Sequence, residues 1–173
     1  LRHGIEAVPA LERGSRHTDR EIRYRCERIL LVVREQEQSQ RLEGFLHNYD
    51  PQKDYGLPGW NPVKARLGDT AESRLLFVEM QQSEPDLMRA YEQGPKVVQE
   101  SLSVRVNLVQ QHLQFFPQDL PLGTAATMLL IVSDDRISYN TAAGQLVYNF
   151  SQFPSFRASL LAGSNRDLLR DMM

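Results

Sequence analysis

Apolar residues recur at helical spacing along most of this chain of 173 residues. Within 22–33 they follow one another at intervals of four, three, one and three residues, positions that share one face of an α-helix. Prolines and glycines interrupt the pattern at short intervals, as they do between helices. The sequence therefore predicts an all-α fold.

Turn-forming residues divide the chain into three parts. Residues 1–47 predict two helices, the second opened by Thr18 as N-cap with Glu21 three residues later, an arrangement that satisfies two free backbone donors. Residues 48–62 predict a linker loop, because three prolines and two glycines there exclude a regular helix. Residues 63–173 predict an irregular helical bundle.

Further helix starts are predicted in the bundle at the Asp69–Glu72 pair and at Ser83. The longest helix is expected over 95–116. Within it, residues 102–108 alternate between apolar and polar, as a strand would. The wider window keeps the helical period without turn residues, so we predict helix there.

The segment 122–132 is apolar on nearly all sides and predicts the central, most buried helix. Three more helices are predicted after it, over 138–150, 154–163 and 164–173. The longest apolar run, 128–132, is far shorter than the roughly 20 residues that a membrane span needs, so no span is predicted.

Charge and composition limit the classes of function that the chain can have. The net charge of −2 and the pI of about 6.1 lack the basic excess typical of nucleic-acid binders, so a nucleic acid is not the expected partner. The arginines of the first segment lie among glutamates, which favours an ion-paired, solvated face over an arginine comb that binds phosphates. Arg16, Arg20 and Arg23 are candidate partner-binding residues within that segment.

The predicted linker is rich in aromatic residues, and Tyr49, Tyr55 and Trp60 are candidate partner-binding residues. Trp60, the only tryptophan, has two interpretations. In the one we favour, it folds back and fills the joint between two subdomains. In the other, it anchors a partner protein with the tyrosines beside it.

No catalytic, metal-binding or cofactor-binding pattern is recognisable. The four histidines lack zinc-ligand spacing, and Cys26 is predicted to be a small core residue rather than a nucleophile. The single cysteine and the lack of a visible signal peptide slightly favour the cytoplasm, although the compartment stays open. Because the chain begins with Leu1 rather than methionine, we expect its N-terminus to be truncated.

Two short motifs occupy characteristic places within residues 4–33. Ala10–Leu11 lies near the end of the first predicted helix, and Asp19-Arg20-Glu21-Ile22-Arg23 opens the second. With these motifs the segment resembles a HEAT-type helical repeat. The resemblance covers the first fifth to quarter of the chain and is more specific for fold than for function.

The HEAT resemblance implies roles for three residues. Asp19 would serve the helix N-terminus, Ile22 would enter the core between repeats, and Arg23 would bond to a neighbouring repeat. The remainder, residues 60–173, looks like a bacterial helical domain of unknown function. Together these likenesses imply HEAT-like helix pairs packed on an irregular C-terminal bundle. HEAT-type repeats share no active site, so no functional residue is carried over.

The sequence favours a non-enzymatic protein–protein interaction or scaffold domain, part of a longer chain, with an unidentified protein partner. One alternative is a HEAT-like nucleic-acid-binding protein, which needs the arginines to gather on one face. Another is an enzyme with an unrecognised site. A deep pocket that gathers His112, Asp134 and Arg136, or similar groups with shifted pKa values, would favour the enzyme, although Asp134–Asp135 is otherwise predicted to form a turn.

Overall fold

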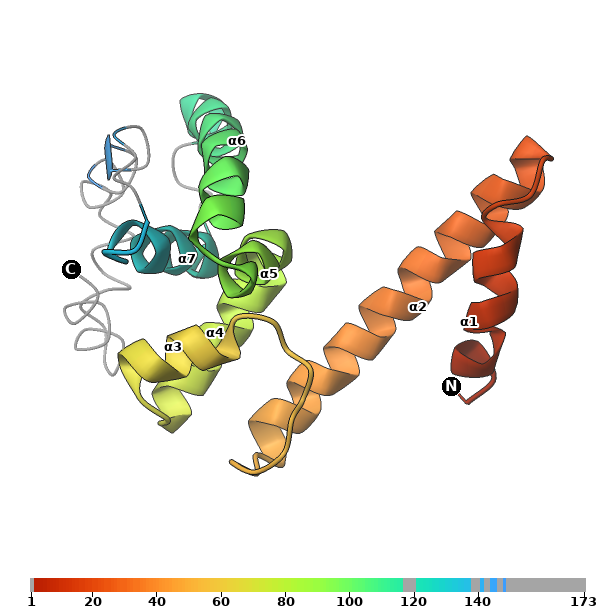
Figure 1. Cartoon of the computed structure of the whole chain (residues 1–173), viewed down its shortest axis with the longest axis horizontal. Helices are drawn as coiled ribbons and strands as arrows, with labels where there is room; N and C mark the ends of the chain where they lie inside the picture. Colours follow the sequence, from red (N-terminus) through yellow and green to blue (C-terminus); the bar gives the residue numbers. More distant parts are fainter. Residues whose placement is uncertain (1, 117–120, 138–140, 142–143, 146–147, 149–173) are drawn as a thin grey trace. The chain divides into compact units, whose positions relative to one another are not determined.

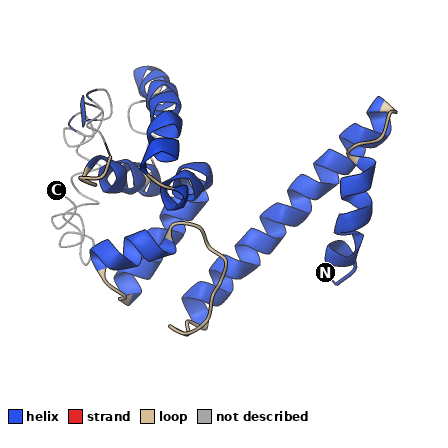
Figure 2. Ribbon diagram, viewed as in Figure 1, coloured by secondary structure: helices blue, strands red, loops and turns tan. Residues whose placement is uncertain are grey.

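A computed structural model describes residues 2–116, 121–137, 141, 144–145 and 148 of the chain. These residues form seven helices and no strand, which confirms the all-α prediction (Figure 2). The chain divides into two compact units, Leu1–Gly56 (unit 1) and Leu57–Met173 (unit 2).

Unit 1 is a hairpin of two helices, α1 (Arg2–Gly14) and α2 (Arg20–His47). Figure 1 shows α1 lying antiparallel beside only the N-terminal half of α2. The helices approach closely at Gly14, where an added Cβ atom would lie 2.4 Å from Cys26 Sγ. Cys26 is half-buried in this contact.

The prediction of Thr18 as the N-cap of α2 is wrong by one residue. Asp19 is the cap, and its Oδ1 accepts the backbone N–H groups of Glu21 at 2.8 Å and Ile22 at 3.3 Å. Both residue types cap helices well, but the carboxylate also interacts favourably with the positive end of the helix dipole.

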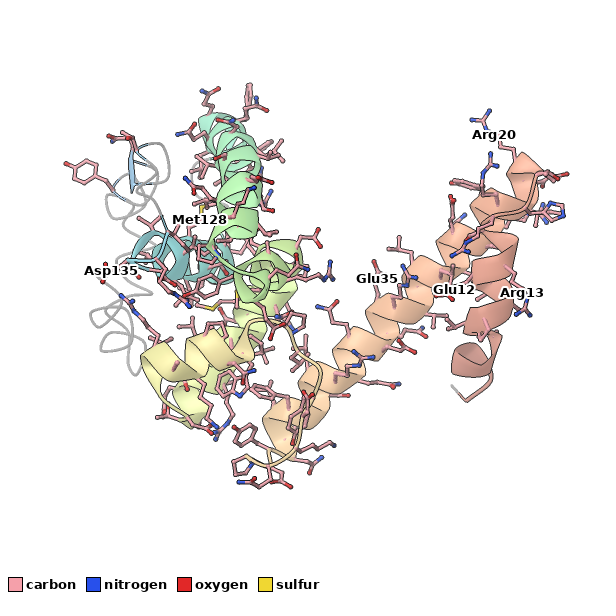
Figure 3. All side chains as sticks on the ribbon, in the orientation of Figure 1. Glu12, Arg13, Arg20, Glu35, Met128 and Asp135 are labelled. Carbon is pink, nitrogen blue, oxygen red and sulfur yellow. The ribbon has the colours of Figure 1, made fainter. Side chains whose placement is uncertain are left out.

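Unit 2 contains the other described helices, which are α3 (Trp60–Leu67), α4 (Ala71–Ser83), α5 (Pro85–Gln93), α6 (Pro95–Phe115) and α7 (Leu122–Val132). Helix α7 packs on α4 and α5, α6 packs on α5, and α3 packs on α4. Every residue from Gly123 to Ile131 is buried, which confirms the prediction that this helix is the most enclosed. Met128 lies in this interior (Figure 3).

Helix α3 begins at Trp60, so the loop predicted over 48–62 is three residues too long at its end. Pro62 does not prevent this start, because it lies in the first helical turn, where a backbone N–H has no acceptor within the helix. The division between units 1 and 2 falls within this segment, after Gly56.

Two further helix starts also differ from the prediction. Thr70, rather than Asp69, caps α4 and forms a reciprocal capping box with Ser73. Asp69 instead pairs with Lys64 at 2.8 Å and Arg74 at 2.7 Å. A carboxylate held by two cations is less available to the helix end than a neighbouring hydroxyl.

Glu84, rather than Ser83, precedes α5, and Ser83 completes α4. The helix predicted over 95–116 is observed as α6. It is not the longest described helix, because α6 has 21 residues and α2 has 28.

Residues 102–108 are helical, and the structure explains why they alternate. Leu102 and Val106 are buried on one face of α6, whereas Val104 and Leu108 are exposed on another. Two apolar faces on one helix therefore produce a strand-like pattern without a strand.

The predicted C-terminal helices cannot be compared in the same way. The helix predicted over 138–150 lies mostly outside the described residues. Those predicted over 154–163 and 164–173 lie wholly outside them.

Candidate interaction surface

The three candidate arginines gather at the turn between α1 and α2. Arg16 lies in the turn and Arg20 begins α2, and both are exposed. Arg20 projects away from the two helices (Figure 3). Arg23 is half-buried, and its Nη1 donates to the carbonyl of His17 at 3.3 Å, so it fastens the turn to the first turn of α2.

Farther along α2, the charges are largely balanced within unit 1. Arg25 pairs with Glu21 one helical turn earlier, and Arg34 lies 3.6 Å from Glu12 of α1. These groups are exposed, and such pairs contribute only about 0–1 kcal/mol each to stability. They nevertheless neutralise part of the positive charge of α2.

Helix α2 also exposes large apolar side chains. Cys26 lies against Gly14 of α1, and the less exposed Leu30 and Val33 share its helical stripe. Five others are exposed between positions 22 and 32 of the helix: Ile22, Tyr24, Ile29, Leu31 and Val32.

Four of these five fall on two opposite sides of the helix, and Val32 lies between the two sides. Ile22 and Ile29 are seven residues apart and lie beside the stripe that contains Cys26. Tyr24 and Leu31, also seven apart, lie on the opposite side, because successive residues are rotated by about 100°. Tyr24 is 64% exposed and Leu31 58%. These residues and the turn arginines Arg16 and Arg20 are named the α2 surface below.

The candidate tyrosines are engaged at the other end of α2. The rings of Tyr49 and Tyr55 both meet the buried Phe45 edge-on, at centroid distances of 5.3 and 5.4 Å. The Tyr55 hydroxyl donates to the carbonyl of Asn48 at 2.6 Å and accepts from the N–H of Asp50 at 2.8 Å. Both tyrosines thus close the end of α2 within unit 1.

Trp60 belongs to unit 2, as the first residue of α3. Its half-buried ring lies 5.2 Å from that of Phe77 in α4. The indole therefore joins α3 to α4, whereas the two tyrosines pack in unit 1.

A polar cluster surrounds Asp134, which the sequence places in a predicted turn and, with Arg136 and His112, in the pocket of the enzyme alternative. The Tyr91 hydroxyl donates to Asp134 Oδ2 at 2.7 Å, and Arg136 donates to the same oxygen through Nη2 at 2.6 Å. These three residues line a surface pocket of about 490 Å³ with residues of α3 and α5. His112 lies elsewhere on α6, with its ring 5.3 Å from that of Phe116.

The pKa shifts in this cluster fix the protonation states. The hydrogen bond from Arg136 holds the pKa of the Asp134 carboxyl well below its usual range, and the same bond raises the pKa of Arg136. Burial, helped by the hydrogen bond to Asp134, raises the pKa of Tyr91 to about 12. Near neutral pH the carboxylate stays ionised and the phenol stays protonated, so charge-assisted hydrogen bonds hold the segment after α7 to α5.

A second cluster ties α6 and α7 to the junction of α4 and α5, around the buried carboxylate of Glu84. Arg105 of α6 donates to it twice, at 2.7 Å and 2.6 Å, and Thr124 of α7 donates at 2.8 Å. The pKa of Arg105 is raised by its hydrogen bond to Glu84. The partners lie 21 and 40 residues from Glu84 along the chain, so no local sequence signal reveals them.

Among the described residues, no three histidine, cysteine, aspartate or glutamate side chains gather as a metal ion would need. None of the helices in the described part of the chain combines the length and the apolar character needed to cross a lipid bilayer. Comparisons of the chain with protein-family models, with curated proteins and with solved structures found no match.

Proposed function

We propose that this chain is a non-enzymatic protein-interaction domain that binds a partner protein through the α2 surface. One observation carries the proposal: α2 exposes five large apolar side chains between 22 and 32, although a helix-pairing partner, α1, is already in place. An exposed apolar side chain favours association with another protein, because binding removes it from water.

The polar part of the α2 surface indicates the character of the partner. Arg16 and Arg20 are exposed at the end of the surface where α2 begins. Arginine is enriched at protein interfaces because its guanidinium group forms two hydrogen bonds with one carboxylate. The proposed partner therefore presents apolar side chains with acidic groups beside them.

The same proposal includes the HEAT-type character of unit 1. It is supported by the cap of α2, because Asp19 accepts two backbone N–H groups at the position that the HEAT motif assigns to an aspartate. Ile22 is exposed within the described residues, where a further helix of a repeat array would cover it.

The test is affinity capture with the full chain as bait, from an extract of the source organism treated with nuclease. Replacing Tyr24→Ser and Leu31→Ser together removes two exposed apolar side chains and is expected to reduce recovery of the partner about tenfold or more. The control replaces Gln36→Ala and Gln40→Ala, exposed polar residues of the same helix, and is expected to leave recovery unchanged.

The comparison of variants decides the outcome. Capture alone does not support the proposal, and equal recovery with both double variants would contradict it. Circular dichroism of each variant checks that the helices are retained. Recovery that disappears after nuclease treatment would instead favour the nucleic-acid alternative, whose supporting observation is the exposed pair Arg16 and Arg20.

A further inference from the structure

Helix α6 carries a second apolar stripe, distinct from the one that packs in unit 2. Its members are exposed, with Phe115 76% and Val104 64% accessible, and they follow one another at intervals of seven, four and seven residues: Val97, Val104, Leu108 and Phe115. At about 100° per residue, all four lie within about 20° of one line along the helix. The buried residues of α6, such as Leu102 and Val106, lie on another side.

This stripe is symmetric about residue 106. Val97 and Phe115 are equally far from that position, and so are Val104 and Leu108. In a two-fold symmetric interface, residue i of one copy meets residue j of the other, and j meets i. Two antiparallel copies of α6 would therefore place Val97 opposite Phe115 and Val104 opposite Leu108.

The side-chain sizes and charges fit this antiparallel arrangement. Each contact combines a smaller valine with a larger Phe or Leu, which allows facing side chains to interdigitate. Glu100, at the edge of the stripe, would lie near Gln111 of the other copy, whose amide can donate to it. A parallel arrangement would instead bring Phe115 against Phe115.

We infer that the chain forms a homodimer through antiparallel pairing of α6, with a second copy covering the stripe. The inference concerns unit 2 and does not depend on the α2 surface. Burial of Val104, Leu108 and Phe115 drives the association of the two copies. In the single chain, each of these side chains exposes half or more of its surface.

The test measures the mass of the full chain in solution by sedimentation equilibrium, over a range of concentrations. A dimer has twice the chain mass of 19.9 kDa. Val104→Lys and Leu108→Glu, each alone, are expected to raise the dissociation constant of the dimer tenfold or more. Ser103→Lys, an exposed position on α6 outside the stripe, is the matched control and is expected to leave it unchanged.

Mixing the two charged variants tests the antiparallel register. Since position 104 of one copy faces position 108 of the other, the Lys and Glu chains should form a mixed dimer more tightly than either variant associates with itself. Wild-type chain that stays monomeric at about 100 µM would overturn the inference, as would dimerisation unaffected by both substitutions or no preference for the mixed dimer. If the wild-type chain is monomeric and Val104→Lys lowers its melting temperature, another part of the same chain, rather than a second copy, covers the stripe.

Discussion

Glu84 connects four helices of unit 2 through one residue. Its backbone N–H donates to Met80 at the end of α4, and its carbonyl accepts from Met88 at the start of α5. Its carboxylate receives Arg105 from α6 and Thr124 from α7. A buried carboxylate is costly unless its oxygens are hydrogen-bonded, and these contacts satisfy both oxygens. The junction of α4 and α5 is therefore tied to the two helices that follow.

The carboxylate of Asp134 is also buried and hydrogen-bonded, and its hydrogen bonds make the stability of the fold depend on pH. Its pKa is depressed, first by the hydrogen bond from Arg136, so the folded state binds a proton less readily than the unfolded chain. The resulting stability is present above the ordinary carboxyl pKa of about 4 and is lost as pH falls toward the depressed value.

Asp134→Asn is expected to lower the free energy of unfolding at neutral pH by about 1–3 kcal/mol, because the charged hydrogen bonds are lost. It should also flatten the decline of stability below about pH 4. Urea unfolding followed by Trp60 fluorescence measures this, because the only tryptophan belongs to unit 2. Asp135→Asn, at the exposed neighbouring position, is the control, and identical acid dependence in wild type and Asp134→Asn would contradict the expectation.

At the scale of elements, α4 and α7 approach until their backbones touch. A Cβ atom on Gly123 would lie 2.0 Å from the carbonyl oxygen of Glu79, a backbone atom that cannot rotate away. The small residue lets α7 pack directly on α4, and every residue from Gly123 to Ile131 is buried as a result.

Gly123→Ala is expected to destabilise unit 2 by about 3 kcal/mol, because the two helices must separate to accept the methyl group. Thermal and urea unfolding of the variant, followed by circular dichroism and Trp60 fluorescence, measure the loss. Gly44→Ala in α2 is the control: nothing lies within 4 Å of the added Cβ, so it should stabilise unit 1 by about 0.5–1 kcal/mol. A neutral Gly123→Ala would show that α7 is not fixed against α4.

Sequence patterns located the elements better than their ends. The all-apolar surface of α7 and the helical period of α6 predict both helices correctly, since burial and periodicity are local properties of the sequence. The predicted N-cap differs from the observed one by one residue where two neighbouring side chains are both able to cap a helix. Asp69 and Thr70 are such a pair, and the choice depends on ion pairs of Asp69 that only the folded chain forms.

The clusters around Glu84 and Asp134 were less predictable. Arg105 and Thr124 reach Glu84 only after α6 and α7 have packed. Asp134 carried a weak local signal, because Arg136 lies two residues away, but Tyr91 is 43 residues distant. The sequence grouped Tyr49, Tyr55 and Trp60 by proximity along the chain, whereas the tyrosines pack on Phe45 and the indole on Phe77.

For the whole molecule, the division into two units predicts where a protease cuts first. The segment 50–54 is exposed and non-helical, whereas Lys64 lies within α3 and pairs with Asp69. A lysine-specific protease should therefore cleave first after Lys53, because cleavage requires local unfolding that an exposed loop already provides. Lys96, in the first turn of α6, is the third lysine of the chain.

Mass spectrometry of a time course should show fragments 1–53 and 54–173 before any other products. Lys53→Gln should remove these early fragments without accelerating cleavage elsewhere. Early cleavage after Lys64 or Lys96 instead would show that α3 or α6 opens more readily than the segment 50–54.

The position of α7 in the chain has a consequence for protein synthesis. Its residues leave the ribosome after those of α4 and α5, yet α7 covers apolar side chains of both helices. Until 122–132 has emerged, the nascent chain cannot bury the α4 and α5 surfaces that await it. A pause in translation shortly before that segment would therefore prolong the interval in which the growing polypeptide is vulnerable to aggregation and attractive to chaperones.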